Sequence, residues 1–314
     1  MVPAALDSVG AALSSADWNE RHAALARINT AYPAALPGAL VTPVLELLTR
    51  EASAGVDHAG DEDFGEYLVD LVLTGVRTDD ARAIPDVLKL DGLGISSGVA
   101  AFVAKHGTAV MPALDALAET REDRASDVVE TYALMYSRFG SRLTRLDSAR
   151  VLRRLLNFAA HPSPAVRAQL AYVASRGLIA ELQPLLEDLA GSDPGQIDGV
   201  YVVRQDATEG LPALRRATVT VTTSELLNRL TLLTDAACES AAGRLGGQCV
   251  ALNAQLSTAL RHLSDTNPQA ATAALGVFRR AVQRLADERV LPRVNAVTLD
   301  GAAAALVDRL GGAR

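Results

Sequence analysis

Short amphipathic segments separated by frequent helix breaks constrain this chain more than any other feature of its sequence. Apolar residues recur at intervals of three and four, for example over 40–48 and over 151–156, which is the spacing of a helix with one buried face. Glycine, proline and aspartate interrupt the pattern often enough to leave room for helices of roughly 10 to 18 residues. The sequence therefore predicts an all-α fold built from many short helices.

A motif recurs at several of these breaks, and it consists of a proline followed closely by two or three large aliphatic residues. Proline is tolerated in the first turn of a helix because the N–H that it lacks would have no intrahelical partner there. Each copy therefore predicts a helix start. The copies lie at 41–48, 83–88, 110–117 and 182–189.

The segment 161–194 resembles a complete HEAT unit. Ser163 and Pro164 are suited to open its first helix, Gly177 to end that helix, and Pro184 to open the second helix. The resemblance implies a HEAT-like α-solenoid of stacked antiparallel helix pairs, because a single pair cannot bury its apolar face alone. Such an array offers an extended surface to a protein partner.

The predicted repeat domain covers 1–217, and a β-branched run that forms helices poorly supplies a linker at 218–223. The remaining residues, 224–314, resemble the FIMAH-type helical module found at the C-termini of secreted bacterial proteins. The apolar spacing of 252–256 and of 270–278 carries this resemblance. It implies a small helical bundle after the solenoid and favours export.

Cys238 and Cys249 are the only cysteines, and the loop between them contains three glycines. A disulfide across this loop would stabilise the fold by about 3 kcal/mol in the chain-entropy model, and it would indicate an oxidising compartment. The alternative is a pair of unrelated thiols in a cytosolic protein. A zinc site is not expected, because two thiols without a nearby histidine or further cysteine leave the metal under-coordinated.

The charge and hydropathy of the chain indicate which partners and which cellular compartment to expect. A net charge of -7 repels phosphate backbones, so nucleic acid is not an expected partner. No uninterrupted apolar run approaches the roughly 18 residues of a transmembrane helix. The segment 1–7 lacks the basic and apolar regions of a secretory signal. We expect an extracytoplasmic or secreted protein whose leader has been removed, with a cytoplasmic protein as the alternative.

The residue patterns predict no catalytic, cofactor or metal site. The five histidines are scattered, without the pair four residues apart that would place two imidazoles on one helix face. A complete glycine-rich phosphate loop is not present, because Gly92-Leu93-Gly94 lacks the following glycine and the preceding strand. The acidic segment 57–66 could hold a hard cation such as calcium. Its spacing differs from that of an EF-hand, and acids before a helix also complement the helix dipole.

A group of arginines is the remaining candidate for a binding surface. On an acidic chain they could form a local basic face for an acidic partner, or they could be solvated helix faces and internal ion pairs. The residues are Arg138, Arg142, Arg145, Arg150, Arg153 and Arg154.

Together these features predict a non-enzymatic scaffold that binds an unidentified protein through a helical-repeat surface. An envelope- or carbohydrate-associating accessory protein is the second hypothesis. Sugar sites usually present exposed aromatic rings, whereas Trp18 is the only tryptophan and Phe278 the only aromatic residue of 224–314. A lyase-like enzyme subunit is the third hypothesis, and reactive, reduced cysteines would be its signature.

Overall fold

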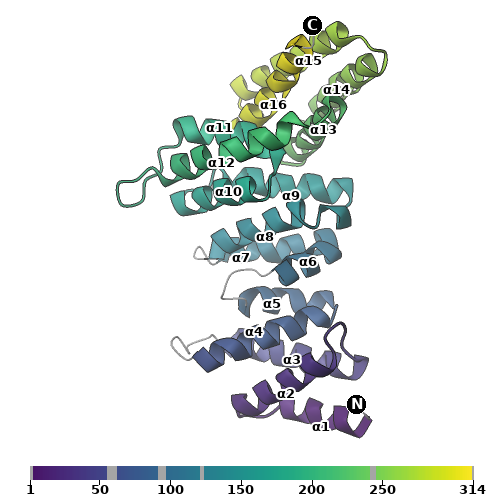
Figure 1. Ribbon diagram of the computed structural model, residues 1–314, viewed down its shortest axis with the longest axis vertical. Helices are drawn as coiled ribbons and strands as arrows, with labels where there is room; N and C mark the ends of the chain where they lie inside the picture. The colour runs from purple at the N-terminus through teal and green to yellow at the C-terminus, as the bar shows by residue number, and fades with distance from the viewer. Residues whose placement is uncertain (1–2, 55–61, 91–96, 121–123, 241–244, 313–314) are drawn as a thin grey trace. The chain divides into compact units, whose positions relative to one another are not determined.

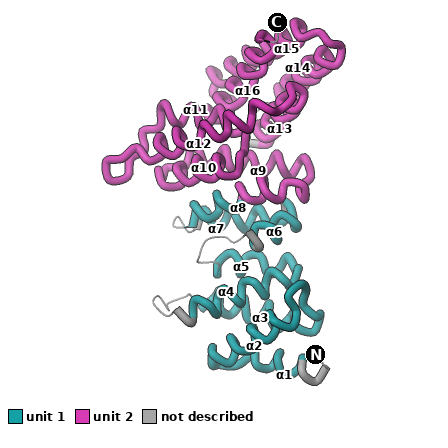
Figure 2. The backbone as a smooth tube through the Cα atoms, in the orientation of Figure 1, with its two compact units in different colours: residues 1–131 teal, residues 132–314 magenta. Residues whose placement is uncertain are grey.

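The computed structural model is helical throughout the residues that it describes, as the sequence predicts (Figure 1). The backbone outside the helices forms turns and one isolated antiparallel bridge, between Ile197 and Val200. The chain divides into two compact units, Met1–Thr131 and Tyr132–Arg314 (Figure 2). The described residues are 3–54, 62–90, 97–120, 124–240 and 245–312.

Unit 1 consists of short helices that pack on their neighbours along the chain. The third helix contacts the first, fourth and fifth helices, and the fifth also contacts the seventh. Leu25, Ile28, Leu48, Leu71 and Leu88 are fully or almost fully buried between them. The helices are α1 (Pro3–Leu13), α2 (Trp18–Ala31), α3 (Gly38–Ala54), α4 (Glu62–Arg77), α5 (Ile84–Leu90), α6 (Ser97–His106), α7 (Met111–Thr120) and the first part of α8 (Ala125–Ser137).

A buried polar group ties α2, α3 and α4 together in unit 1. Arg21 forms an ion pair with Glu51 at 3.0 Å and donates from Nε to the hydroxyl of Tyr67 at 2.9 Å. Burial raises the pKa of Tyr67 to about 12, so this hydroxyl stays protonated at neutral pH. Arg21 also donates to the backbone carbonyls of Ser15 and Ala16, both at 2.9 Å, so its donors are used within the fold, which indicates a structural role.

Unit 2 holds the remaining helices. The tenth and eleventh helices both pack on the twelfth, and the eleventh also packs on the sixteenth. The thirteenth contacts the ninth, fourteenth and sixteenth helices, and the fifteenth lies on the fourteenth and sixteenth. The helices are α9 (Arg145–Phe158), α10 (Pro164–Arg176), α11 (Gln183–Ser192), α12 (Val202–Val219), α13 (Thr223–Ser240), α14 (Gly247–Ser264), α15 (Pro268–Asp287) and α16 (Arg293–Gly312).

Three of the four proline motifs begin helices as predicted. Pro85, Pro112 and Pro184 are each the second residue of their helix. Pro43 is the exception, because α3 begins at Gly38 and carries this proline in its interior. The break at Pro37 lies upstream, so the helix starts there, and α3 forgoes the one hydrogen bond that Pro43 cannot donate.

The predicted linker 218–223 contains a short break between two helices, at residues 220–222. The twelfth helix continues through Val219 and the thirteenth begins at Thr223. The Thr218 hydroxyl lies 2.8 Å from the carbonyl oxygen of Leu214 and 2.9 Å from Oε1 of Gln183, and these contacts support the last turn of α12 before the break. Both flanking helices belong to the same compact unit, and the division between units falls at 131/132 rather than at 217/224.

The tenth and twelfth helices approach closely at Gly210. A Cβ atom built on Gly210 would lie 2.4 Å from the Cβ of Ser175 and 2.8 Å from its Oγ. Real side chains do not tolerate such a contact, so the two helices would have to separate. A glycine is therefore required at this crossing.

We expect the Gly210→Ala variant to lose about 1–3 kcal/mol of unfolding free energy, because the added methyl group overpacks the crossing of α10 and α12. Adding Ser175→Gly should recover part of this loss by opening the opposing side. Urea unfolding of the wild type, both single variants and the double variant gives the coupling energy. Additive effects of the two substitutions would contradict the predicted contact.

Of the helices formed by the described residues, none combines the length and the apolarity needed to cross a bilayer.

Candidate binding surface

The two cysteines lie together at the junction of α13 and α14. Cys238 and Cys249 are at disulfide distance, with their Cα atoms 5.8 Å apart. The pairing considered from the sequence therefore has the geometry that a disulfide requires. Residues 241–244 of the connecting loop fall outside the described part of the chain. The bridge would join the ends of two helices that also pack against each other.

Protein purified in air and alkylated without reduction should show no added mass, because Cys238 and Cys249 should be joined to each other. Reduction before alkylation should then add two alkyl groups per chain, measured by intact-mass spectrometry. The matched Cys238→Ser, Cys249→Ser variant should lose about 3 kcal/mol of unfolding free energy in the chain-entropy model. Two thiols that alkylate freely without reduction would contradict the bridge and support the cytoplasmic alternative.

Half of the arginines proposed as a basic face contact residues of α13. Arg145 pairs with Asp235 at 2.9 Å, and Arg153 donates to the backbone carbonyl of Glu239 at 3.2 Å. Arg150 lies 3.7 Å from the carboxylate of Glu239. These contacts hold α9 against α13, so the three arginines serve internal ion pairs.

The other three arginines are spread over different surroundings. Arg138 is exposed just after α8, Arg142 lies over the ring of Phe139 at 5.3 Å, and Arg154 is half-buried on α9. Binding of an acidic partner by these three stays a prediction.

The acidic segment 57–66 lies mainly outside the described residues, and only its last part belongs to α4. Within the described part of the chain, no three histidine, cysteine, aspartate or glutamate side chains come together as a metal site would require. The possible cation site in this segment stays a prediction.

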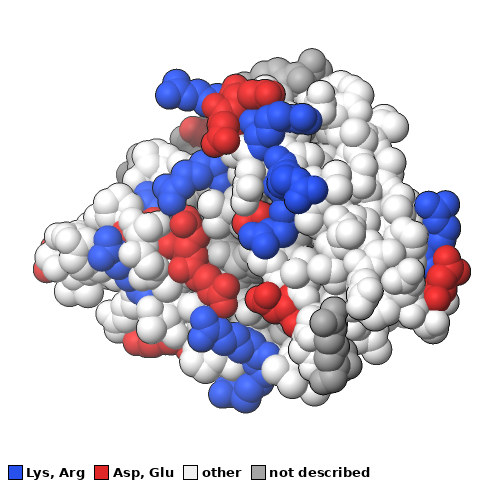
Figure 3. All heavy atoms as spheres, turned by 90° about the horizontal axis from the view of Figure 1, so that it is seen from above, with Lys and Arg blue, Asp and Glu red and all other residues white. Residues whose placement is uncertain are grey.

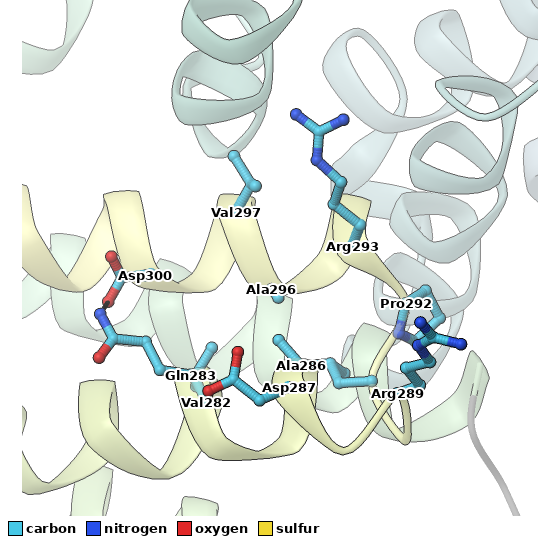
Figure 4. Close-up of a pocket in the computed structure, with 11 residues that line it drawn as sticks. Val282, Gln283, Ala286, Asp287, Arg289, Pro292, Arg293, Ala296, Val297 and Asp300 are labelled. Atoms are coloured by element: carbon cyan, nitrogen blue, oxygen red, sulfur yellow. Dashed lines mark hydrogen bonds between the residues drawn. The ribbon is translucent and has the colours of Figure 1, made fainter.

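An open pocket lies between the end of α15 and the start of α16 (Figure 4). Its volume is about 530 Å³, and we call it the α15–α16 pocket. Apolar side chains form its floor, and charged and amide groups form its rim (Figure 4). The floor residues are Val282, Ala286, Leu291, Pro292, Ala296 and Val297, and the rim residues are Gln283, Asp287, Arg289, Arg293 and Asp300.

A second hollow, of about 500 Å³, lies where the ends of α9 and α11 and the starts of α10 and α16 meet. We call it the α9–α11 hollow. It is lined by Ala159, Ala160, His161, Pro162, Arg167, Leu185, Asp188, Leu189, Ser192, Asp193, Pro194, Arg293 and Val294.

A buried ion pair forms one wall of the α9–α11 hollow. Arg167 donates to both carboxylate oxygens of Asp193, at 2.8 and 2.9 Å, and its Nη1 donates to the carbonyl of His161 at 2.6 Å. Burial alone would raise the pKa of Asp193. Hydrogen bonds from Arg167 and from the Gly195 N–H, together with the charges of Arg167 and Arg204, have a larger effect and lower this pKa below its usual range. Asp193 is therefore an anion, and its ion pair with Arg167 holds this side of the hollow in place.

Arg293 connects the two cavities, because its side chain lines both. Its Nη2 donates to the two carboxylate oxygens of Asp188, at 3.1 and 3.3 Å. The side chain is 73% exposed, so the guanidinium keeps donors for a partner. The α15–α16 pocket and the α9–α11 hollow thus flank the first residue of α16.

Figure 3 shows one face of the molecule, on which acidic and basic side chains are interspersed. The α15–α16 pocket likewise has Asp287, Arg289, Arg293 and Asp300 beside apolar residues, and an apolar centre with a polar rim is typical of surfaces that recognise other proteins. A surface that binds nucleic acid would instead carry mainly positive charges.

Sequence reasoning missed the residues that shape this surface. Arg167 and Asp193 lie within the predicted HEAT unit 161–194, whose pattern does not indicate that they pair, and Asp188 and Arg293 are separated by more than a hundred positions. No local spacing could indicate that such distant residues meet.

Comparison of the chain with protein-family models, with curated proteins and with solved structures found no match. The HEAT-like and FIMAH-like resemblances are therefore interpretations of the sequence alone.

Proposed function

We propose that this protein is a non-enzymatic scaffold that binds another protein on the surface formed by the α15–α16 pocket and the α9–α11 hollow. The observation that carries the proposal is the juxtaposition of two open cavities, both with apolar side chains in their lining, around the exposed guanidinium of Arg293. This arrangement suits two anchor side chains of one partner, with a charged or polar group between them.

The size and chemistry of the cavities support a protein partner. Anchor residues of protein interfaces fill well-defined pockets at the centre of the contact, and a polar rim excludes water around them. Cavities of about 530 and 500 Å³ can each take a large apolar side chain with room for part of its backbone. The polar rim residues would fix the register of the partner.

The cysteine pair supports an extracytoplasmic location for this scaffold. Disulfides persist in oxidising compartments and are rare in the cytosol. The distance between Cys238 and Cys249 fits a disulfide, and the alkylation experiment described above tests this part of the proposal. A HEAT-like stacking of the helices would place the two cavities on one continuous surface, and it belongs to the same proposal.

Site-specific photo-crosslinking tests the binding surface directly. A photoreactive amino acid replaces Gln283, at the rim of the α15–α16 pocket, or Ser192, in the α9–α11 hollow. Both side chains are exposed and need not be buried for folding. The control position is Ser257, which is also exposed but lies on α14 outside both cavities.

Cross-linking in an extracytoplasmic extract should give the same adduct from positions 283 and 192 and none from position 257. Mass spectrometry of the adduct identifies the partner. Equal adducts from all three positions, or none from 283 and 192, would refute the proposed surface. An adduct with a glycan instead of a protein would favour the envelope- or carbohydrate-associating hypothesis.

A further inference from the structure

The connection between α11 and α12 forms a small, well-defined hairpin. Ile197 and Val200 exchange two backbone hydrogen bonds, of 3.0 and 2.9 Å. Asp198 and Gly199 between them have φ values of 50° and 81°. Positive φ at both central residues is the mark of the tight turn that joins antiparallel strands, and aspartate followed by glycine is well suited to it. We call residues 197–201 the hairpin.

The base of the hairpin is held by the buried ion pair of the α9–α11 hollow. Arg204 donates to the backbone carbonyl of Asp193 at 2.6 Å, and the Gly195 N–H donates to the Asp193 carboxylate at 2.7 Å. The guanidinium of Arg204 also lies over the ring of Tyr201, 4.4 Å from its centre. The hairpin is therefore presented in one conformation, which lowers the entropy cost of binding.

The hairpin displays large apolar side chains that remain partly exposed to solvent. Ile197 is 39% exposed, Val200 49% and Tyr201 42%. Together with the turn, they form a rigid projection that has an apolar body and a carboxylate at its tip. Within the described residues, Asp198 has no ion-pair partner.

The α15–α16 pocket has the complementary features. Its floor is apolar, and Arg289 stands at its rim, exposed and without an ion-pair partner among the described residues. Figure 4 shows Asp287 on the same rim, beside the apolar floor. The N–H groups of Asp198 and Gly199 are not used within the hairpin and can donate to such a carboxylate.

We propose that the hairpin of one copy of this protein binds in the α15–α16 pocket of a second copy. Ile197 and Val200 cover the apolar floor, and the carboxylate of Asp198 pairs with Arg289. Asp287 accepts from the N–H groups of the turn. The inference rests on the proposed function, because it names the occupant of one of the two cavities.

This contact joins two different patches, one from each copy, so it is a head-to-tail contact. A hairpin seated in a pocket buries less than the roughly 1,200 Å² of a stable interface. We therefore expect a weak, concentration-dependent association, with a dissociation constant between about 1 μM and 1 mM. Added salt should weaken it further because the pair is exposed.

Charge reversal on each side provides the test. Asp198→Arg places a cation at the hairpin tip against Arg289, and Arg289→Glu places an anion at the rim against Asp198. Each single variant should bind itself more than about tenfold more weakly than the wild type, because like charges then meet. The double variant restores an opposite-charge pair and should recover self-association. Asp265→Arg is the control, since it makes the same charge change at another exposed residue of unit 2.

Sedimentation velocity of the full chain over a range of concentrations measures the association. We expect the average mass to rise with concentration in the wild type and in Asp265→Arg. It should stay that of the monomer in both single variants and rise again in the double variant, and this pattern would support the contact. A 1:1 mixture of the two single variants should also associate. A wild type that stays monomeric up to about 1 mM, or single variants that associate as the wild type does, would overturn it.

The two proposals fail in distinguishable ways. A foreign protein cross-linked from position 283, together with a monomeric wild type, would overturn self-association and leave the scaffold function standing. Self-association that follows the charge-reversal pattern, without any foreign adduct from positions 283 and 192, would support the hairpin contact and count against a foreign partner.

Discussion

Replacing Arg167 with alanine is expected to lower the free energy of unfolding of unit 2 by about 3–5 kcal/mol. The side chains of Arg167 and Asp193 are only 10% and 5% exposed, so the variant leaves a buried carboxylate without its main partner. Urea unfolding of wild type and variant measures the loss. Hydrogen exchange of peptides from α10, α11 and the hairpin shows whether it arises in unit 2.

The pair between Arg215 and Glu187 is the matched control. It has a similar distance, 3.0 Å, but its side chains are 59% and 40% exposed. Water and salt screen such a pair, so Arg215→Ala should cost no more than about 1 kcal/mol. Equal losses in the two variants would show that burial does not govern the Arg167 contact.

The same ion pair predicts a dependence of stability on pH. The pKa of Asp193 is lower in the folded state than in the unfolded chain. The ionised carboxylate of Asp193 therefore contributes fully to stability at pH values above its pKa in the unfolded chain, which is near 4. This contribution is lost as the pH falls through the lower pKa that Asp193 has in the folded protein. The stability difference between wild type and Arg167→Ala should be constant near neutral pH and shrink below pH 4. An unchanged difference in acid would contradict the lowered pKa.

Replacing Phe278 with alanine is expected to cost about 3–5 kcal/mol. Phe278 is fully buried on α15, where that helix packs on α14 and α16, so the substitution removes the ring and leaves a cavity. Thermal and urea unfolding, followed by circular dichroism, measure the change.

The neighbouring residue supplies the control for this second variant. Val277 precedes Phe278 in the same helix and is 40% exposed. Val277→Ala should change the unfolding free energy by no more than about 0.5 kcal/mol. A small effect at Phe278, or a large one at Val277, would place the core of the last three helices on a different face of α15.

The helical class and many helix starts could be predicted from the sequence because they depend on residues close together in the chain. Apolar spacing selects the buried face of a helix, and a proline such as Pro85 or Pro184 fits only where an N–H is dispensable. Pro43 escaped this reasoning, because the stronger break at Pro37 lies only a few residues before it.

The sequence also identified Cys238 and Cys249 as a candidate bridge from their number and spacing, and the structure places them at disulfide distance. It was less informative where long-range contacts oppose local preference. The β-branched residues from Thr218 onward favour a linker, yet α12 extends as far as Val219, where Gln183 and Arg309 contact its last turn.

The candidate binding surface was decided by tertiary structure alone. Arg293 meets Asp188 across 105 positions, and Arg145 meets Asp235 across 90. The first contact creates the junction of two cavities, and the second turns a possible basic face into an internal ion pair. Periodicity and capping report on neighbours within a few turns, whereas a pocket forms where the ends of distant helices meet. The sequence by itself therefore determined what the helices are, and only their packing decided which side chains remain free to bind.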